Sequence, residues 1–84
     1  MMLKQDIDFI EFRKAISELL GIDESEINEE SVIYQDIGID SLGLVNLGIK
    51  IQKIYEIEIP PAVMVEVRTI GDFYYNVKEL VQNK

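Results

Sequence analysis

Cysteine and histidine are both absent from this 84-residue sequence. Without cysteine there is no thiolate nucleophile and no disulfide, and without histidine the usual general base near neutral pH is missing. A Ser–His–Asp triad and a zinc site of the usual Cys/His type are therefore excluded within the chain. The chain is not expected to be an enzyme, and the lack of disulfides is consistent with a reducing, cytoplasmic location.

Long apolar runs and basic residues are also scarce. No run reaches the roughly 18 apolar residues expected of a membrane span, and residues 1–12 lack the apolar stretch of a signal peptide. Lys and Arg number 8 against 16 Asp and Glu, a net charge of −8, and the excess of acid lies in residues 1–40. This argues against nucleic acid as a partner. The acidic half either attracts basic partners or keeps the protein soluble.

The first part of the chain predicts one helix and a long connection. Apolar residues at helical spacing indicate a helix over about residues 7–20, and Gly21 is a typical C-terminal stop signal. The stripe consists of Phe9, Phe12, Ile16, Leu19 and Leu20. Residues 22–40 lack a clear period. We expect this segment to lie across the bundle, with a helical turn near residues 24–28.

Three more helices are expected after residue 40. The second runs from Ser41 to about Tyr55, a short third follows Pro60, and Thr69 opens the last as the N-cap of a capping box. The second helix presents a wide apolar surface: Leu42, Val45, Leu47, Ile49, Ile51, Ile54 and Tyr55. The sequence thus predicts an all-α fold: one domain, 1–84, forming a small four-helix bundle with a core of about 7–82.

Ser41 lies in the stretch "DIGIDSLG", residues 36–43. Asp40 is a candidate N-cap, so that Ser41 opens the second helix. A helix N-terminus has free N–H groups and about half a positive charge, and it tolerates a phosphate. From these residues alone, Ser41 is either an ordinary helix-start residue or the bearer of a phosphodiester. An EF-hand is excluded because Ser41 occupies the position that requires glycine.

Residues 36–60, "DIGIDSLGLVNLGIKIQKIYEIEIP", resemble the centre of the acyl carrier protein family. The spacing from Ser41 to Pro60 matches without a gap, and "VRTIGDFYYNV" resembles the junction into the family's last helix. The resemblance covers about residues 7–82. It implies that Ser41 carries 4′-phosphopantetheine, which a separate transferase moves from coenzyme A with magnesium. The chain would then carry acyl intermediates as thioesters.

The same resemblance implies partners and a monomeric state. The partners would be a phosphopantetheinyl transferase, an acyl-loading ligase or transferase, and condensing or other acyl-processing enzymes of fatty-acid-like, polyketide or other specialised biosynthesis. Family members of fatty-acid synthesis line the second helix with acids, whereas this chain has none between Asp40 and Glu56. A dedicated pathway is therefore expected. Candidate partner contacts are Asp36, Asp40, Leu42, Asn46 and Met64.

Two alternatives stay open. The first is a carrier-like helical module that binds partners without a prosthetic arm, and the acid-poor second helix favours it. The second is an aminoacyl or D-alanyl carrier. Aminoacyl carriers usually have Gly-Gly before the serine motif, whereas this chain has Ile37-Gly38-Ile39, which is closer to the acyl type.

Overall fold

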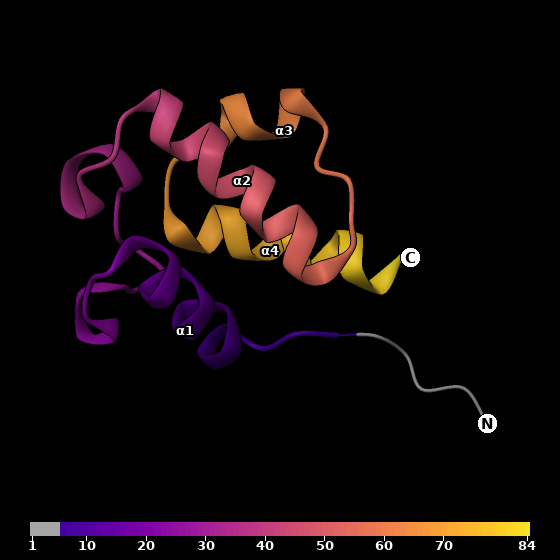
Figure 1. The fold of residues 1–84 in the computed structure, drawn as a ribbon, viewed down its shortest axis with the longest axis horizontal. Helices are drawn as coiled ribbons and strands as arrows, with labels where there is room; N and C mark the ends of the chain where they lie inside the picture. The colour runs from indigo at the N-terminus through magenta and orange to yellow at the C-terminus, as the bar shows by residue number, and fades with distance from the viewer. Residues whose placement is uncertain (1–5) are drawn as a thin grey trace.

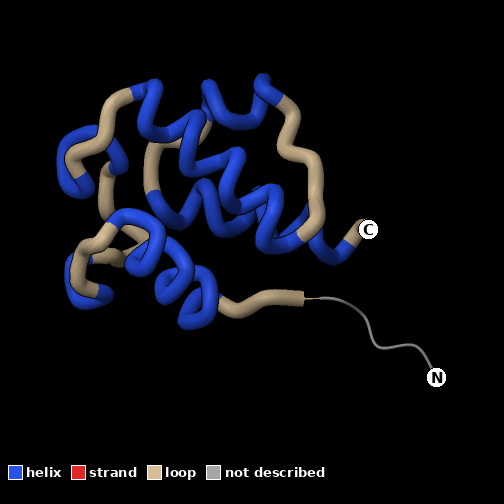
Figure 2. Tube along the Cα trace, in the orientation of Figure 1, coloured by secondary structure: helices blue, strands red, loops and turns tan. Residues whose placement is uncertain are grey.

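A computed structural model describes residues 6–84. In this part of the chain the fold consists of helices and loops without strands (Figures 1 and 2), as the sequence predicted. The four α-helices are α1 (Phe9–Leu20), α2 (Ser41–Tyr55), α3 (Pro61–Glu66) and α4 (Ile70–Gln82). The connection between α1 and α2 contains a 3₁₀ turn, η1 (Glu24–Glu26), and a π-helical turn, η2 (Ile33–Ile37). The 3₁₀ turn was expected and the π turn was not.

Local capping chemistry sets the ends of the helices. The Asp8 side chain accepts a hydrogen bond from the Glu11 N–H at 2.8 Å, so α1 begins two residues later than predicted. Gly21 ends α1 in the left-handed region, with φ 71°, as the sequence indicated. At α4, the Asp72 N–H donates to Thr69 Oγ1 and the Thr69 N–H donates to the Asp72 carboxylate, both at 3.1 Å. This is the predicted capping box.

The core forms where α1 crosses α4. Phe12 and Phe73 are fully buried and meet edge to face, with ring centroids 5.3 Å apart. Ile27 and Ile33, from the long connection, are also fully buried. The backbone of this connection is fixed as well, because the Ile33 N–H donates to the Arg68 carbonyl at 2.9 Å. The connection is therefore packed against the bundle, as expected.

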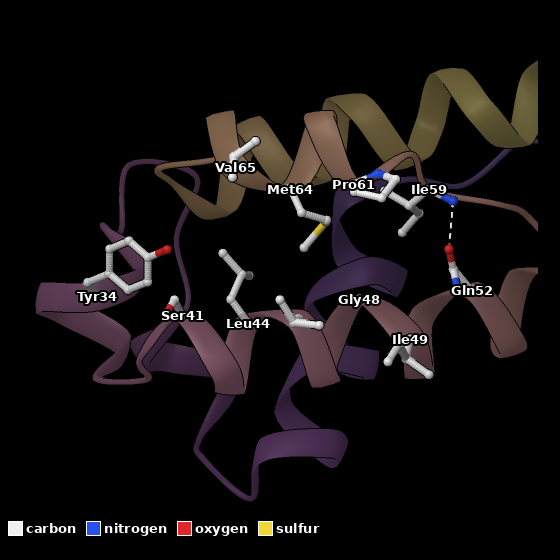
Figure 3. Close-up of a pocket in the computed structure, with 11 residues that line it drawn as sticks. Tyr34, Ser41, Leu44, Gly48, Ile49, Gln52, Ile59, Pro61, Met64 and Val65 are labelled. Atoms are coloured by element: carbon white, nitrogen blue, oxygen red, sulfur yellow. Dashed lines mark hydrogen bonds between the residues drawn. The ribbon is translucent and has the colours of Figure 1, made fainter.

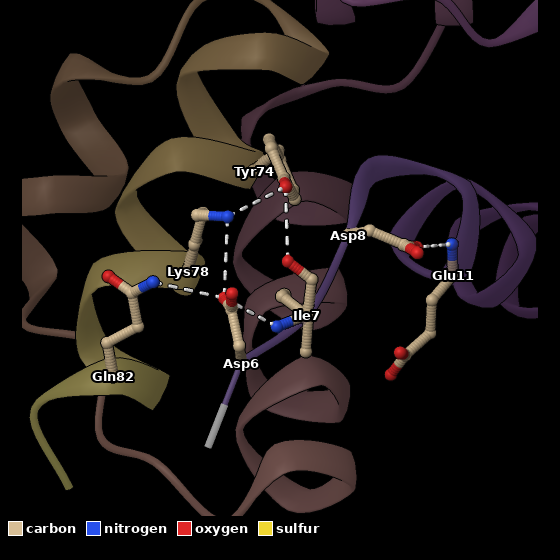
Figure 4. A network of polar contacts seen from close by, with 7 residues as sticks. All are labelled: Asp6, Ile7, Asp8, Glu11, Tyr74, Lys78 and Gln82. Carbon is tan, nitrogen blue, oxygen red and sulfur yellow. Dashed lines mark hydrogen bonds and ion pairs between the residues drawn. The ribbon is translucent and has the colours of Figure 1, made fainter. Parts of the chain in front are cut away.

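The segment before α1 is held against α4 by polar contacts (Figure 4). The Asp6 carboxylate lies 3.4 Å from Lys78 Nζ and accepts from Gln82 Nε2 at 3.1 Å. The Tyr74 hydroxyl donates to the Ile7 carbonyl at 3.1 Å. The backbone N–H of Ile7 and then the Lys78 ammonium lower the pKa of Asp6. Three side chains of α4, each about one turn from the next, thus hold this segment.

The apolar surface of α2 divides into a buried and an exposed side, a division that the sequence prediction did not make. The buried side is Leu44, Leu47, Gly48 and Ile51, and the exposed apolar residues are Leu42, Val45, Ile49 and Ile54. Leu44 was missing from the predicted apolar set, although it is 2% exposed. Because α2 is apolar on several sides, its periodicity alone does not select the face that packs on the core. None of the helices in residues 6–84 is long and apolar enough to cross a membrane.

Candidate functional site

Ser41 is the first residue of α2 and is exposed. The chain reaches it through the π turn, which ends at Gly38 with φ 85° and a hydrogen bond from the Gly38 N–H to the Ile33 carbonyl at 3.0 Å. A side chain is strained at this φ, so glycine suits the position. Asp40 then caps α2, its carboxylate accepting from the Gly43 N–H at 2.8 Å. The predicted N-cap of α2 is thus present, and Ser41 lies in the first turn of this helix.

The two acids nearest Ser41 have local structural roles. Besides the cap made by Asp40, the Asp36 carboxylate accepts from the Val32 N–H at 2.7 Å and so closes the π turn. Both residues remain exposed. Their expected contact with partner enzymes stays a prediction, as does that of Leu42 and Asn46, which are exposed on the first turns of α2.

A cavity of about 400 Å³ opens between α2 and α3 beside Ser41 (Figure 3). Ser41 and Tyr34 lie at one end of it, and Gln52 and Ile59 lie at the other, about three turns along α2. Gln52 Oε1 accepts from the Ile59 N–H at 2.7 Å and so joins the end of α2 to the loop before α3. The remaining lining residues are apolar or glycine: Leu44, Val45, Gly48, Ile49, Pro61, Met64 and Val65.

Gly48 permits the close approach of α3 to α2. A Cβ atom at this position would lie 3.0 Å from Met64 Cε and 3.4 Å from Met64 Sδ. Met64 is half-buried and forms the cavity wall opposite Gly48. Its side chain therefore contributes more to the cavity than to the outer surface of the protein. Its proposed contact with partners is untested.

The cavity has no Asp, Glu, Lys or Arg side chain among its lining residues. Its polar side chains are those of Tyr34, Ser41 and Gln52. In residues 6–84 there is also no group of three or more Asp or Glu side chains placed to hold a metal ion. The site thus combines an exposed hydroxyl, that of Ser41, with a mainly apolar cavity beside it.

Sequence reasoning singled out Ser41, whose role stays a prediction, but it did not name the residues that line the cavity. Tyr34 was overlooked because it comes from a single π turn, which has no repeating pattern to reveal it. Gln52 gave no signal either, since its role depends on a backbone N–H seven residues away. Of the two glycines in α2, Gly48 makes a close contact with another helix, at Met64, whereas Gly43 lies against Ile39 and Asp40.

The cap at the head of α2 gives a direct stability prediction. Asp40→Ala should lower the free energy of unfolding by about 1 kcal/mol, because the Gly43 N–H loses its acceptor. For a domain of this size the melting temperature should fall by roughly 4–8 °C, measured by circular dichroism. Asp40→Asn keeps an acceptor at the cap and should lose much less. Equal losses in both variants would contradict the capping role.

Two comparisons with known proteins bear on this site. Residues 11–74 match the family described as "Phosphopantetheine attachment site". The chain is also 34% identical over 71 residues to a protein of Thermotoga maritima named "Acyl carrier protein". That alignment covers 84% of this chain and 88% of the relative. Both matches span Ser41 and most of the residues around the cavity.

Proposed function

The chain belongs to the phosphopantetheine-attachment family of acyl carrier proteins, and from that premise we propose that it carries acyl groups as thioesters on an arm attached to Ser41. The prosthetic group of this family is 4′-phosphopantetheine, and its members are carriers and not catalysts. The observation that supports Ser41 most strongly is its place: an exposed hydroxyl at the capped head of α2, at the mouth of an apolar cavity.

The residues around Ser41 suit a phosphodiester. The N–H groups of the first turn of α2 have no carbonyl partners within the helix, and the helix dipole favours a negative group there. Asp40 satisfies one of these N–H groups and leaves the end of the helix exposed. The phosphopantetheine arm would bring its own thiol, which explains why a carrier functions without cysteine. Bases and metals would come from the partner enzymes.

The cavity supports an apolar acyl group as the cargo. Its walls are mainly aliphatic, and its opening lies beside the attachment point (Figure 3). An aminoacyl or D-alanyl group is less well matched, because its protonated amine would find no carboxylate among the lining residues. The proposed partners are a phosphopantetheinyl transferase, an acyl-loading ligase or transferase, and condensing or other acyl-processing enzymes of one dedicated pathway.

Intact-protein mass spectrometry tests the proposal. The purified chain is incubated with coenzyme A, magnesium and a broad-specificity phosphopantetheinyl transferase, with a known carrier as the active control. We expect a gain of one phosphopantetheine per chain. If the folded protein gains no mass while the control is modified, the chain acts without an arm and the proposed function is wrong.

A second prediction tests the cavity. The octanoyl form should unfold at a higher temperature than the acetyl form, because each buried methylene contributes about 0.8 kcal/mol. Burial of only two methylenes would raise the melting temperature by roughly 6 °C or more. In Gly48→Leu this difference should disappear, because the new side chain would occupy the space next to Met64.

The matched control for Gly48→Leu is Asn46→Leu, which adds a side chain of the same kind on the exposed side of α2. It should keep the full difference between the octanoyl and acetyl forms. An equal difference in wild type and Gly48→Leu would show that the acyl chain does not enter this cavity. Comparing two acyl forms of one variant removes the effect of the substitution on the helix itself.

A further inference from the structure

The outer face of α2 is apolar in its first half and basic in its second. We define this outer face as Leu42, Val45, Asn46, Ile49, Lys50 and Lys53, which fall on one side of the helix and are all exposed. Leu42 is 67% exposed, Val45 48% and Ile49 44%. Single exposed apolar residues are ordinary on protein surfaces, but these three follow each other along one side of the same helix. They form a continuous apolar strip that begins next to Ser41, and two of them, Val45 and Ile49, also border the cavity.

The two lysines of the outer face have no acidic partner on α2. No Asp or Glu occurs between Asp40 and Glu56, so neither of the positions one turn away from Lys50 is acidic. The ion pairs found in residues 6–84 join Arg13 to Glu24 and Lys78 to Asp6, and do not involve Lys50 or Lys53. Lys53 lies in the last turn, where it stabilises the helix dipole, but Lys50 lies too far from the end for that role.

Any enzyme that receives the arm must approach Ser41, and the outer face begins at the next residue. With a rise of about 1.5 Å per residue, Lys50 lies about 14 Å and Lys53 about 18 Å along α2 from Ser41. A standard interface of about 800 Å² per partner is wide enough to reach both. Asp36 and Asp40 lie at the Ser41 end of α2, and Glu56 caps its other end, three positions after Lys53. The charge along the outer face is thus negative beside Ser41 and positive at Lys50 and Lys53, with one acid following the lysines.

We propose that the enzymes served by this carrier cover the outer face of α2 with a surface that is apolar at its centre and bears carboxylates opposite Lys50 and Lys53. The inference rests on the proposed function, because attachment at Ser41 is what brings the enzyme to this surface. Complementary charges at the two ends of α2 would fix the orientation of the bound enzyme. An enzyme whose docking surface is basic along its whole length would be repelled at the two lysines.

The test uses the arm-loading reaction itself with two purified phosphopantetheinyl transferases. One is chosen for a basic carrier-binding surface, and the other for an apolar surface edged by carboxylates. We expect wild type to be modified with the higher kcat/KM by the second enzyme. Lys50→Glu/Lys53→Glu should lower that value at least tenfold and raise the value for the basic enzyme. Added salt should reduce the effect of the charges.

A matched control separates docking from net charge. Lys14→Glu, at an exposed position in the middle of α1, makes the same charge change as the single variant Lys50→Glu. Lys14→Glu should alter kcat/KM less than twofold with either enzyme, whereas Lys50→Glu should lower it severalfold with the carboxylate-edged enzyme. Lys50→Gln is a milder variant and should give an intermediate loss with the carboxylate-edged enzyme. Circular dichroism verifies that each variant is folded, which we expect because Glu and Gln are good helix formers.

The outcomes distinguish the two proposals. If both transferases modify wild type and the Lys50→Glu/Lys53→Glu variant equally well, the docking inference is wrong while attachment of the arm stands. If neither enzyme modifies any variant, the proposed function itself fails. Sedimentation tests whether the outer face binds a second copy of the chain instead of an enzyme. A concentration-dependent dimer of wild type that the Lys50→Glu/Lys53→Glu substitutions dissociate would contradict the inference.

Discussion

Ser41→Ala is expected to abolish addition of phosphopantetheine while the fold remains intact. Alanine has no oxygen to form the phosphodiester bond, so the gain in mass should be lost completely. The structural cost should be small, because Ser41 is exposed and the helix is capped by Asp40. A surface change of this kind usually alters the free energy of unfolding by no more than about 0.5 kcal/mol. Intact mass and thermal unfolding measure the two effects separately.

Ser25→Ala is the matched control for this experiment. Ser25 is an exposed serine that also follows an aspartate cap, since the Asp23 carboxylate accepts the Ser25 N–H at 2.9 Å. This variant should be modified as fully as wild type. Modification of Ser41→Ala at another residue would refute the assignment of Ser41. Loss of modification in Ser25→Ala would show that Ser41 and its surroundings do not suffice for modification by the transferase.

Phe12→Ala should have the largest effect on stability. Phe12 is fully buried, and its ring centroid lies 5.3 Å from that of Phe73 and 5.6 Å from that of Tyr74. Truncating a buried phenylalanine costs about 3–5 kcal/mol, because apolar contacts are lost and a cavity remains. Small domains have a total stability of about 5–15 kcal/mol, so this loss is a large fraction of it. The melting temperature should fall by roughly 12 °C or more.

Ile10→Ala, in the same helix, is the control for Phe12→Ala. Ile10 is 66% exposed, so its truncation should change the free energy of unfolding by no more than about 0.5 kcal/mol. Urea titration followed by circular dichroism gives both values. Similar losses in the two variants would mean that the contact between α1 and α4 does not dominate the stability of the bundle.

The limits of the helices were readable from the sequence because they depend on local chemistry. Gly21 adopts the left-handed conformation that it favours, and the Asp40 side chain needs only an N–H three residues away. Thr69 and Asp72 satisfy each other within one turn. The π turn over residues 33–37 escaped prediction because a single turn has no period. It is fixed instead by distant contacts, such as that of the Ile33 N–H with the Arg68 carbonyl.

Within the candidate site, only Ser41 could be singled out from the sequence. Ser41 belongs to a contiguous motif, whereas the cavity depends on how α2 and α3 pack together. Leu42 and Leu44 are equally apolar in the sequence, yet one is 67% exposed and the other 2% exposed. A helix with apolar residues on several sides does not reveal which of them will be buried. The division between the buried and the exposed side of α2 therefore required the tertiary structure.

The contact between the last residue and the end of α2 has a practical consequence for tethering. Lys84 Nζ donates to the Tyr55 carbonyl at 3.0 Å, so this side chain reaches the last turn of α2 while Ser41 occupies the first. The two ends of this helix are about 21 Å apart. Figure 1 likewise shows the C-terminus on the side of the molecule away from the start of α2. A linker, fusion partner or solid support joined after residue 84 would leave Ser41, the proposed attachment point, facing the surrounding solution.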